Sequence, residues 1–495
     1  MAKKGLLCLS LTESTIRRNI ELAEKYRGKI DIAELRADFL KESEYKYIEK
    51  FPKEISVPAI LTLRNRNGGG LFTGSDNERR FILMAGLKAP YSYIDLEHDN
   101  YDTELEKAAK ASSVTVIRSV HDYSGVPESV SGLINNLARN PGEIPKAAFF
   151  PKTTQELLRL MSAYGSLENK PAILLGMGDY GIPTRLLAGK LGSFLSYTSE
   201  KKDSAAPGHI SIEDMTGLYR YREINKDTAV YGVVGNPVMH SSSPIIHNQG
   251  FKELGLNAVY IPFLADDIGE FMKLSRLLDI KGLSVTIPHK ETVIPFLSGV
   301  DNIISSVGAC NTVFLKNGGY YGTNTDAEGF LAPLKQIFHG VVPKGLRATI
   351  IGAGGAARSA VYSLKRNNID VLILNRTEGR AEKLGAEFGC EWGSIMPNDT
   401  EQSIKKMSEY NDIIVQATRV GMAPDISGDP LPGYEFSGNE IVYDMVYKPR
   451  ETVFLRRAFK AGCRIVHGID MLIEQAKFQF KIFTSRDFPF SDFSL

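Results

Sequence analysis

The first half of the chain repeats one pattern, a short apolar run followed by a segment with helical spacing. Strands that alternate with helices favour parallel βα units. Eight such units match the smallest closed (β/α)8 barrel, whereas an open doubly wound sheet, the alternative, rarely needs eight regular repeats. The expected strands are Leu6–Leu11, Asp31–Asp38, Ala59–Arg64, Tyr91–Glu97, Val114–Asp122, Ile144–Lys152, Ala172–Met177 and Phe194–Thr198, and the clearest helical segments are Ser14–Tyr26, Asn77–Leu87, Pro127–Ala138 and Thr154–Ala163.

The length and charge of the chain limit its class. At 495 residues it is too long for a single core, and 59 Lys+Arg against 58 Asp+Glu give no electrostatic case for nucleic acid or an anionic membrane. No apolar run approaches the roughly 20 residues that span a bilayer, and the N-terminal segment MAKKGLLCLSL is interpreted as a first strand rather than a transit peptide. Four distant cysteines argue against zinc or disulfides. We expect a cytoplasmic protein with neither nucleic-acid nor membrane partners.

Ionisable residues crowd the ends of the predicted strands. In a (β/α)8 (TIM) barrel the active site lies at the C-terminal ends of the strands. A single charge there is usually a rim salt bridge, but six of eight strands ending this way indicate a site. No acidic cluster has metal-ligand spacing, so we predict an organic mechanism without a metal. The residues are Glu34, Arg36, Arg64, Asp95, Glu97, His121, Asp122 and Lys152, with Arg185 following the seventh strand.

The segment AAFFPKTTQE at 147–156 supplies the candidate nucleophile. An apolar run ends in Lys152, and a helix is expected to begin at once. Burial and neighbouring cations favour the neutral form of a lysine, and a neutral amine attacks ketones to form a Schiff base. The alternative is a strand-end lysine that extends into water. Nearby arginines suit a substrate carboxylate, and His121 can act as an acid or base near neutral pH.

Five motifs in this half resemble type I 3-dehydroquinate dehydratases. They are ELR at 34–36, SVHDYS at 119–124, FFPKT at 149–153, MGDYGIPTR at 177–185 and AAPGH at 205–209, and the resemblance covers about residues 5–212. It implies an imine between a lysine and the ketone of 3-dehydroquinate, followed by syn elimination of water to 3-dehydroshikimate. By this match Lys152 forms the imine, and His121 moves the C2 proton and protonates the leaving hydroxyl. The residues that bind substrate are then Arg185 for the carboxylate, Glu34, Arg36 and Arg64 for the hydroxyls, and His209 in the lid over the ring.

Three positions depart from the family pattern. The loop after Arg64 reads NRNGGG and lacks the glutamate that many members carry before the glycine pair. His209 replaces a common glutamine, and Ala205 replaces a common serine. We therefore expect the lid to bind substrate differently. The dehydratase domain is predicted at 1–212, and a closing helix and polar connector at 213–228 follow, without a flexible tether.

The second half begins with an expected strand, Ala229–Val234, and a serine cluster before Pro244. The serines could introduce a helix whose N-terminus binds a carboxylate, although an ordinary capped helix is the simpler explanation. Three short β-rich runs then end in polar residues that could act on a substrate, namely Lys290 in GLSVTIPHK, Asn311 in GACNTV and Asp326 in YGTNTDAEGF.

A glycine-rich turn then indicates a nucleotide-binding fold. The turn Gly352-Ala-Gly354-Gly355-Ala356-Ala follows one predicted strand and opens a helix before the next. In this βαβ setting the glycines let the backbone approach a pyrophosphate at the helix N-terminus. The second strand ends in Asn375, Arg376 and Thr377 instead of the acidic residue that favours NAD. The sequence therefore predicts NADP.

These motifs resemble shikimate dehydrogenases over about residues 229–495. The resemblance implies that Lys290 and Asp326 form a catalytic pair at the C3 oxygen, with Lys290 as acid/base, while hydride passes between NADP and C3 of 3-dehydroshikimate. It assigns Ser241 and Ser243 to the carboxylate, Thr286, Asn311 and Gln475 to ring hydroxyls, Tyr447 to the pocket wall, and Gly352, Gly354, Gly355, Ala356, Asn375, Arg376, Thr377, Thr418 and Gly468 to the cofactor. Gln416 departs from the common asparagine in QATRVGM at 416–422.

Together the halves predict two successive steps from 3-dehydroquinate to shikimate. The expected substrate lobe is 229–328 plus 466–495, and the expected Rossmann lobe that binds NADP is 329–465. Two other hypotheses stay open. The second half could act on quinate or another polyol acid, or one half could be an inactive scaffold.

Overall fold

The computed structural model describes residues 5–99, 101–167, 171–395, 400–490 and 493. The chain forms two compact units: Met1–Pro244 with Gly255–Ile280, and Ile245–Leu254 with Lys281–Leu495. The first unit therefore contains the predicted barrel together with the start of the predicted dehydrogenase half. The domain boundaries proposed from the sequence stay predictions.

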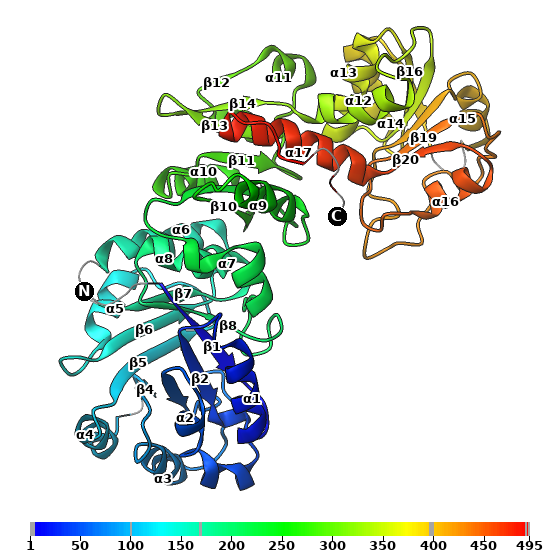
Figure 1. Cartoon of the computed structure of the whole chain (residues 1–495). Helices are drawn as coiled ribbons and strands as arrows, with labels where there is room; N and C mark the ends of the chain where they lie inside the picture. The colour runs from blue at the N-terminus through cyan, green and yellow to red at the C-terminus, as the bar shows by residue number, and fades with distance from the viewer. Residues whose placement is uncertain (1–4, 100, 168–170, 396–399, 491–492, 494–495) are drawn as a thin grey trace. The chain divides into compact units, whose positions relative to one another are not determined.

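The first unit contains the expected eight-stranded parallel barrel (Figure 1). Its strands are hydrogen-bonded in the order β7-β6-β5-β4-β3-β2-β1-β8, so among the described residues the ring of ladders is interrupted between β7 and β8. The strands are β1 (Leu6–Leu11), β2 (Ile32–Arg36), β3 (Ala59–Thr62), β4 (Tyr93–Glu97), β5 (Thr115–Asp122), β6 (Ile144–Phe149), β7 (Ile173–Gly176) and β8 (Leu195–Thr198).

Side-chain alternation divides the barrel interior into layers. Residues two apart on a strand face the same side, so each strand sends alternate side chains inward. The N-terminal ends of several strands contribute a buried apolar cluster that includes Ile32, Ile117 and Ile144. Two positions further along the same strands stand Glu34, Ser119 and Lys146. The apolar layer thus forms a floor, and the polar layer lies toward the C-terminal ends.

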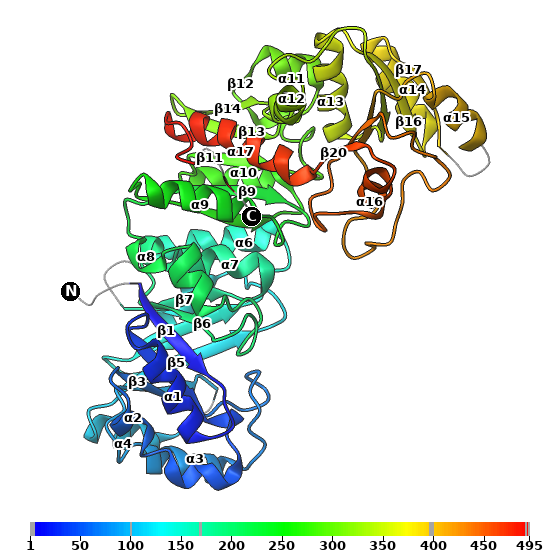
Figure 2. The same cartoon turned by 45° about the vertical axis from the view of Figure 1, so that its right-hand side comes forward.

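Helices surround the barrel strands (Figures 1 and 2). They are α1 (Ile16–Tyr26), α2 (Phe51–Glu54), α3 (Asp76–Gly86), α4 (Thr103–Ala111), α5 (Val130–Leu137), α6 (Thr154–Ser162), α7 (Gly178–Leu186) and α8 (Ala188–Leu191). Ser75 begins α3 with a capping box, and Thr153 caps α6 by accepting a hydrogen bond from the Glu156 amide. The predicted closing helix is shorter than expected, since only the π-helical turn Asp214–Leu218 and the 3-10 turn Tyr221–Glu223 form there.

A further βα segment belongs to the first unit. Strand β9 (Ala229–Gly235) pairs in parallel with β10 (Ala258–Leu264), and α10 (Ile268–Leu277) follows. Asp266, between β10 and α10, accepts hydrogen bonds from the Thr154 amide at 2.7 Å, the Thr154 hydroxyl at 2.6 Å and the Tyr180 hydroxyl at 3.0 Å. This carboxylate therefore joins the segment to the starts of α6 and α7.

The second unit contains a mixed sheet and a nucleotide-binding sheet. In the former, β11 (Gly282–Val285), β13 (Thr312–Lys316), β14 (Gly319–Thr323) and β12 (Gly299–Val300) pair in that order. Its helices are α11 (Asn302–Val307), α12 (Asp326–Ile337) and most of α9 (Ser243–Glu253). The long C-terminal helix α17 (Gly468–Thr484) packs along α12 (Figure 2).

The nucleotide-binding sheet is parallel, with the order β17-β16-β15-β18-β19-β20. This is the order of a Rossmann fold. The elements are β15 (Arg347–Ile351), α13 (Gly355–Arg366), β16 (Asp370–Asn375), α14 (Glu378–Phe388), β17 (Glu391–Ser394), α15 (Thr400–Met407), β18 (Ile413–Gln416), β19 (Ile441–Asp444), α16 (Val453–Lys460) and β20 (Arg464–Val466).

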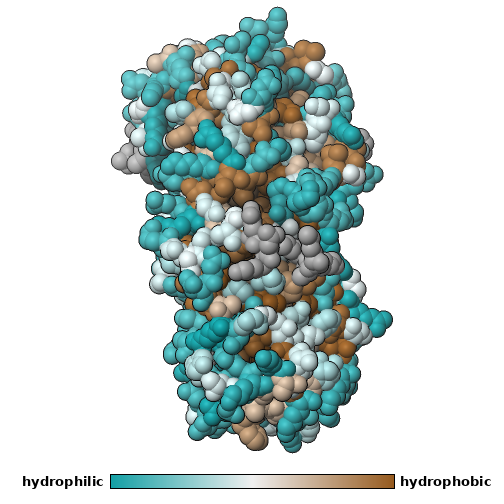
Figure 3. All heavy atoms as spheres, turned by 90° about the vertical axis from the view of Figure 1, so that its left-hand side faces the viewer, coloured by the Kyte–Doolittle hydropathy of each residue, from teal (hydrophilic) through white to brown (hydrophobic). Residues whose placement is uncertain are grey.

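Hydrophilic and apolar side chains are interspersed over the face of the molecule seen in Figure 3. Among the described residues, no helix has both the length and the apolar character needed to cross a membrane.

Candidate active sites

The lysine in the barrel pocket is Lys146, not Lys152. Lys146 lies on β6 and lines a pocket that is partly open to solvent, as does Ala148 two residues further along the strand. Strand β6 ends at Phe149, and Lys152 is exposed beyond it, outside the residues that line the pocket. The prediction for Lys152 was wrong because it extended the strand three residues too far. Pro151 has no amide hydrogen for a ladder, so the alternation of β6 does not reach position 152.

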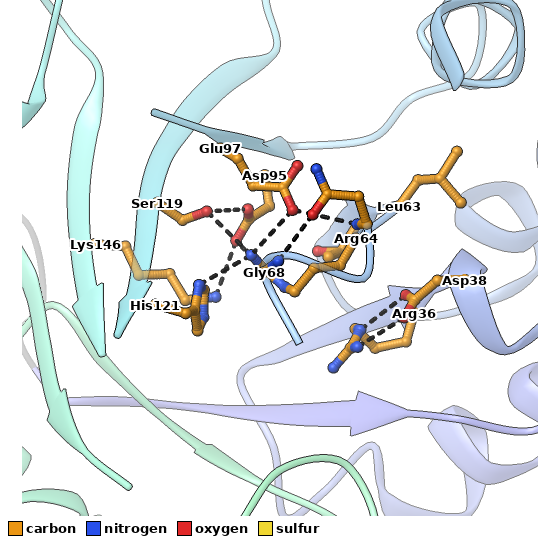
Figure 4. Close-up of polar contacts among 12 residues, drawn as sticks. Arg36, Asp38, Leu63, Arg64, Gly68, Asp95, Glu97, Ser119, His121 and Lys146 are labelled. Carbon is orange, nitrogen blue, oxygen red and sulfur yellow. Dashed lines mark hydrogen bonds and ion pairs between the residues drawn. The ribbon is translucent and has the colours of Figure 1, made fainter. Parts of the chain in front are cut away.

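A buried carboxylate holds Lys146 in place (Figure 4). Lys146 Nζ donates to Asp95 Oδ2 at 2.9 Å and lies 3.9 Å from Glu34 Oε1. Asp95 also pairs with Arg64 NH2 at 2.9 Å and accepts from the Ser119 hydroxyl at 2.6 Å. Burial alone would raise the pKa of Asp95, but the charges of Arg64 and Lys146 outweigh it and hold that pKa well below its usual range. Asp95 therefore stays ionised between the two cations.

His121 lies beside this network. Its Nδ1 is 3.0 Å from Arg64 NH1. A guanidinium can only donate, so Nδ1 accepts, and this assignment places the ring proton of neutral His121 on Nε2. Burial and then the charges of Arg64 and Lys146 lower the pKa of His121 well below its usual value of 6.5. The imidazole is thus neutral at physiological pH and available for proton transfer.

The two charged residues of β2, Glu34 and Arg36, bond to different partners. Glu34 accepts from the Ser10 hydroxyl at 2.6 Å and the Thr62 hydroxyl at 2.9 Å. Arg36 forms two hydrogen bonds to Asp38, at 2.9 and 2.8 Å (Figure 4). Its NH1 also reaches the Ala205 carbonyl at 3.4 Å, so Arg36 contacts the loop that carries His209.

Three residues of this pocket carry buried polar atoms that have no hydrogen-bond partner among the described residues. The atoms are Nε and NH1 of Arg185, Nδ1 of His209 and the hydroxyl of Tyr197, and all three residues line the pocket. Burial lowers the pKa of Arg185 to about 10, so the guanidinium is still a cation at neutral pH. Burial and the charges of Arg185 and Arg36 lower the pKa of His209 well below its usual value. An unpaired buried cation is costly, and a bound anion would satisfy it.

The loop without the family's glutamate packs on a different carboxylate. A Cβ added at Gly68 would lie 2.6 Å from Glu97 Oε1, so the side chain of Glu97 fills the space beside this glycine. Glu97 also accepts from the Asn65 amide at 3.2 Å and from Arg79 NH2 at 2.6 Å. Burial outweighs these contacts and raises the pKa of Glu97. Glu97, at the end of β4, thus holds the loop after Arg64 in place.

In the second unit, Lys290 and Asp326 form the predicted pair. Their side chains make an ion pair, with Asp326 only 2% exposed. Asn311 Nδ2 donates to Asp326 Oδ1 at 2.7 Å, and Asp326 begins α12. The stem of Lys290 lies beside the glycine turn, since a Cβ added at Gly355 would be 3.5 Å from its Cδ. The pair therefore lies next to the predicted cofactor site.

The glycine turn fits a dinucleotide. Gly352 has φ +118°, and Gly354 precedes α13, whose N-terminus has no side-chain cap. A free helix N-terminus favours a phosphate. Arg376 is exposed beyond the end of β16, and so is Arg380 on the first turn of α14. Arg380 is not among the cofactor residues predicted from the sequence, although its position four residues after Arg376 indicates a second cation in the same place. These cations suit the 2′-phosphate of NADP.

The remaining predicted cofactor contacts lie near the same sheet edge. Asn375 Nδ2 donates to the Thr377 carbonyl at 2.8 Å. Gln416, the departure from the family pattern, is buried and braces its loop, because it accepts from the Thr418 amide at 2.8 Å and donates to the Val420 carbonyl at 2.9 Å.

Gly468 opens α17 against the end of β19, where an added Cβ would lie 2.6 Å from the Met445 carbonyl oxygen. Tyr447 packs against a buried cluster that includes Ile473 of α17. Gln475 is partly buried and lies against Gly329 of α12. A Cβ added at Gly329 would be only 2.7 Å from the Cβ of Gln475. Thr286 is partly buried just beyond the end of β11.

The serine cluster belongs to the first unit. Ser241 accepts from the Ser243 amide at 3.2 Å, and Ser243 begins α9. Their substrate role, like that of Thr286, Tyr447 and Gln475, stays a prediction. Among the described residues there is no group of three or more His, Cys, Asp or Glu side chains arranged to hold a metal ion.

Three family models match successive parts of the chain. Residues 7–226 match the model of the type I 3-dehydroquinase family, 233–313 the shikimate dehydrogenase substrate-binding domain, and 334–422 the shikimate/quinate 5-dehydrogenase family. An NADP(+) shikimate dehydrogenase of Caldanaerobacter subterraneus is 36% identical over 54% of this chain and 95% of its own length. A crystal structure from Thermus thermophilus, a shikimate 5-dehydrogenase with NADP(H) and shikimate, is 34% identical, covers 52% of this chain and 94% of its own, and has a TM-score of 0.47.

A relative from Arabidopsis thaliana spans both halves. It is the chloroplastic bifunctional 3-dehydroquinate dehydratase/shikimate dehydrogenase, 31% identical over 98% of this chain and 83% of its own length. The chain therefore belongs to the family of bifunctional 3-dehydroquinate dehydratase/shikimate dehydrogenases.

Proposed function

We propose that the barrel dehydrates 3-dehydroquinate through an imine on Lys146 and that the C-terminal half reduces the resulting 3-dehydroshikimate to shikimate with NADPH. The observation that carries the first assignment is the placement of Lys146. It is a buried lysine that lines the barrel pocket together with Arg36, Arg64 and Arg185. This replaces the assignment of the same chemistry to Lys152.

The dehydratase step needs one nucleophile and one proton carrier. The amine of Lys146 adds to the ketone carbon, and loss of water leaves an iminium. This cation acidifies the neighbouring C2–H, and His121 removes the proton to give an enamine. His121 returns the proton to the departing hydroxyl, and hydrolysis of the new iminium frees Lys146. Arg185, whose Nε and NH1 have no hydrogen-bond partner among the described residues, is the proposed contact for the carboxylate.

The reductase step depends on the second pair. NADPH, when bound, supplies the hydride. Asp326 holds Lys290 beside the nucleotide turn, and Lys290 gives a proton to the C3 oxygen as it becomes a hydroxyl. Asn311 fixes Asp326 from the other side. Ser241, Ser243, Thr286, Tyr447 and Gln475 are proposed to contact the substrate, and Gly352, Gly354, Gly355, Ala356, Asn375, Arg376, Thr377, Thr418 and Gly468 to contact the cofactor.

Paired lysine variants test both assignments in the full chain. Lys146→Ala should lower dehydration by roughly 10³-fold or more, and the exposed Lys152→Ala should leave it within about twofold. Lys290→Ala should keep dehydration and lower NADPH oxidation by roughly 10²- to 10⁴-fold. A Lys146→Ala chain that dehydrates normally, or a Lys290→Ala chain that reduces normally, would refute the corresponding assignment.

The alternative substrate is quinate. Turnover of shikimate and quinate with NADP, measured side by side on the purified chain, separates the two, and faster turnover of quinate would overturn the proposal. We also propose that the protein works in a reducing compartment such as the cytoplasm, which is supported by its four cysteines, all free thiols.

A further inference from the structure

Tyr197 lies against the amine of Lys146. It stands on β8, is 3% exposed and lines the barrel pocket. The Nζ atom of Lys146 lies over its ring, 4.3 Å from the centroid. The face of an aromatic ring carries negative potential and attracts a cation within about 6 Å of its centroid. Tyr197 is therefore a third partner of Lys146, beside Asp95 and Glu34.

A second aromatic contact holds this ring in position. The ring of His209 stacks on it, with centroids 6.5 Å apart and planes inclined by 21°. His209 is 5% exposed and belongs to the loop that Arg36 contacts through the Ala205 carbonyl. The buried position of Tyr197 on β8 and its stacking on His209 leave the ring little freedom to turn away from Lys146.

Imine formation changes what Lys146 can donate. Condensation of a lysine ammonium with a ketone releases one water, and the charge of +1 is conserved while the N–H bonds fall from three to one. Hydrogen bonds to carboxylates therefore lose two of their three donors. The attraction of a ring face depends on charge and needs no N–H. The carboxylates keep their Coulomb attraction but lose hydrogen bonds, whereas the contact with the ring of Tyr197 has no hydrogen bond to lose when the imine forms.

We propose that the ring face of Tyr197 stabilises the positive charge that the Lys146 nitrogen carries in the covalent intermediate. This rests on the proposed imine chemistry at Lys146, and it adds a residue that no motif in the sequence indicated. Removal of the ring should reduce the fraction of chain present as iminium, while removal of the hydroxyl alone should not.

The test compares two substitutions at this position in the full chain. Tyr197→Phe keeps the ring, and Tyr197→Leu replaces it with an aliphatic group. Each is saturated with 3-dehydroquinate, quenched with borohydride and analysed by mass spectrometry for the adduct on the peptide that contains Lys146. We expect adduct formation within about twofold of the natural chain for the Phe variant and roughly 5- to 30-fold lower for the Leu variant.

Folding of each variant is checked by circular dichroism and denaturant unfolding of the barrel unit. The rate of 3-dehydroshikimate reduction is no substitute, because the residues proposed for it, Lys290 and Asp326, lie in the second unit. If the Leu variant fails this folding check, a chain with pentafluorophenylalanine at position 197 is used instead. Its ring is similar in size to that of phenylalanine, but the face of the ring no longer carries negative potential. A fluorinated ring that traps as well as phenylalanine would overturn the proposal.

Failure of this proposal differs from failure of the proposed function. If the natural chain forms its adduct on Lys146 and the Leu and Phe variants trap equally, Tyr197 has no such role although the imine chemistry stands. If the natural chain forms no adduct on Lys146, the imine assignment itself is wrong, and this inference falls with it.

Discussion

The Nζ atom of Lys146 and the Oδ2 atom of Asp95 lie 2.9 Å apart, with side chains only 5% and 1% exposed. The proposed nucleophile is thus held in a fixed place by a buried carboxylate. Arg64 shares the same oxygen of Asp95 at 2.9 Å, so one acidic group organises two cations of the pocket.

Asp95→Asn should impair both catalysis and stability. Loss of the charge leaves Lys146 and Arg64 without their shared partner, so dehydration should fall roughly 10- to 100-fold. The free energy of unfolding should be about 3–5 kcal/mol lower at neutral pH, because two buried cations lose their counter-charge. The folded pKa of Asp95 is depressed, so its stabilisation is present above the unfolded value of about 3.9 and is lost as the pH falls further. Denaturant unfolding from pH 2 to 7 should show the stability gap between natural and variant chains widening as the pH rises to about 4 and staying constant above that.

Arg185→Met should separate binding from stability. Nε and NH1 of Arg185 have no hydrogen-bond partner in the described part of the chain, so loss of the guanidinium should raise the KM for 3-dehydroquinate roughly 30-fold or more. The unfolding free energy of the unliganded chain should rise by roughly 1–4 kcal/mol, because the substitution removes a buried cation that lacks a counter-charge. Arg118→Met is the matched control, since Arg118 is equally buried but bonds to Glu106 at 2.6 Å and Glu143 at 2.7 Å. It should lose about 3 kcal/mol of stability and leave KM unchanged. A normal KM in Arg185→Met would contradict the carboxylate assignment.

Arg376→Ala should weaken discrimination between the two cofactors. A charged hydrogen bond to the 2′-phosphate contributes about 1.5 kcal/mol or more, so the KM for NADPH should rise roughly 10-fold while that for NADH changes little. Glu378→Ala, two residues along on the exposed start of α14, is the control and should change neither. Equal effects of Arg376→Ala on both cofactors would place the 2′-phosphate elsewhere.

Asp444→Asn should remove a pH dependence of the stability of the second unit. Burial raises the pKa of Asp444 to about 6, although its carboxylate accepts from Thr452 and the Val446 amide. A raised folded pKa means that stability is fully present below the unfolded value of about 3.9 and is lost as the pH rises through about 6. Relative to the natural chain, the variant should therefore gain roughly 2–3 kcal/mol between pH 4 and 7. The single tryptophan, Trp392 on β17, reports unfolding of this unit by fluorescence. A constant difference across this range would contradict the assignment.

The strand pattern predicted the barrel and the Rossmann order of elements well, because short apolar runs and a glycine turn are local signals. It failed at β6, where chemistry depends on which residue faces inward. Lys146 is a charged residue inside an apolar run, IPKAAFF, and a charge in such a place is itself a signal of a buried functional group. Lys152 follows Pro151, where a strand usually ends.

Other features could not be predicted from the sequence. The contact between Tyr197 and Lys146 joins β8 to β6, the strands on either side of β7, and only the curling of the sheet into a barrel brings them together. Nothing in the residues near Asp266 indicates that this carboxylate bonds to Thr154 and Tyr180 of the barrel, which are remote in sequence. Long-range packing of this kind has no local pattern.

Borohydride trapping with peptide mapping tests the central claim most directly. The natural chain is incubated with 3-dehydroquinate and borohydride, and the modified lysine is located by mass spectrometry. We predict the added mass on Lys146 and none on Lys152. An adduct on Lys152, or no adduct on either lysine during active turnover, would contradict the account.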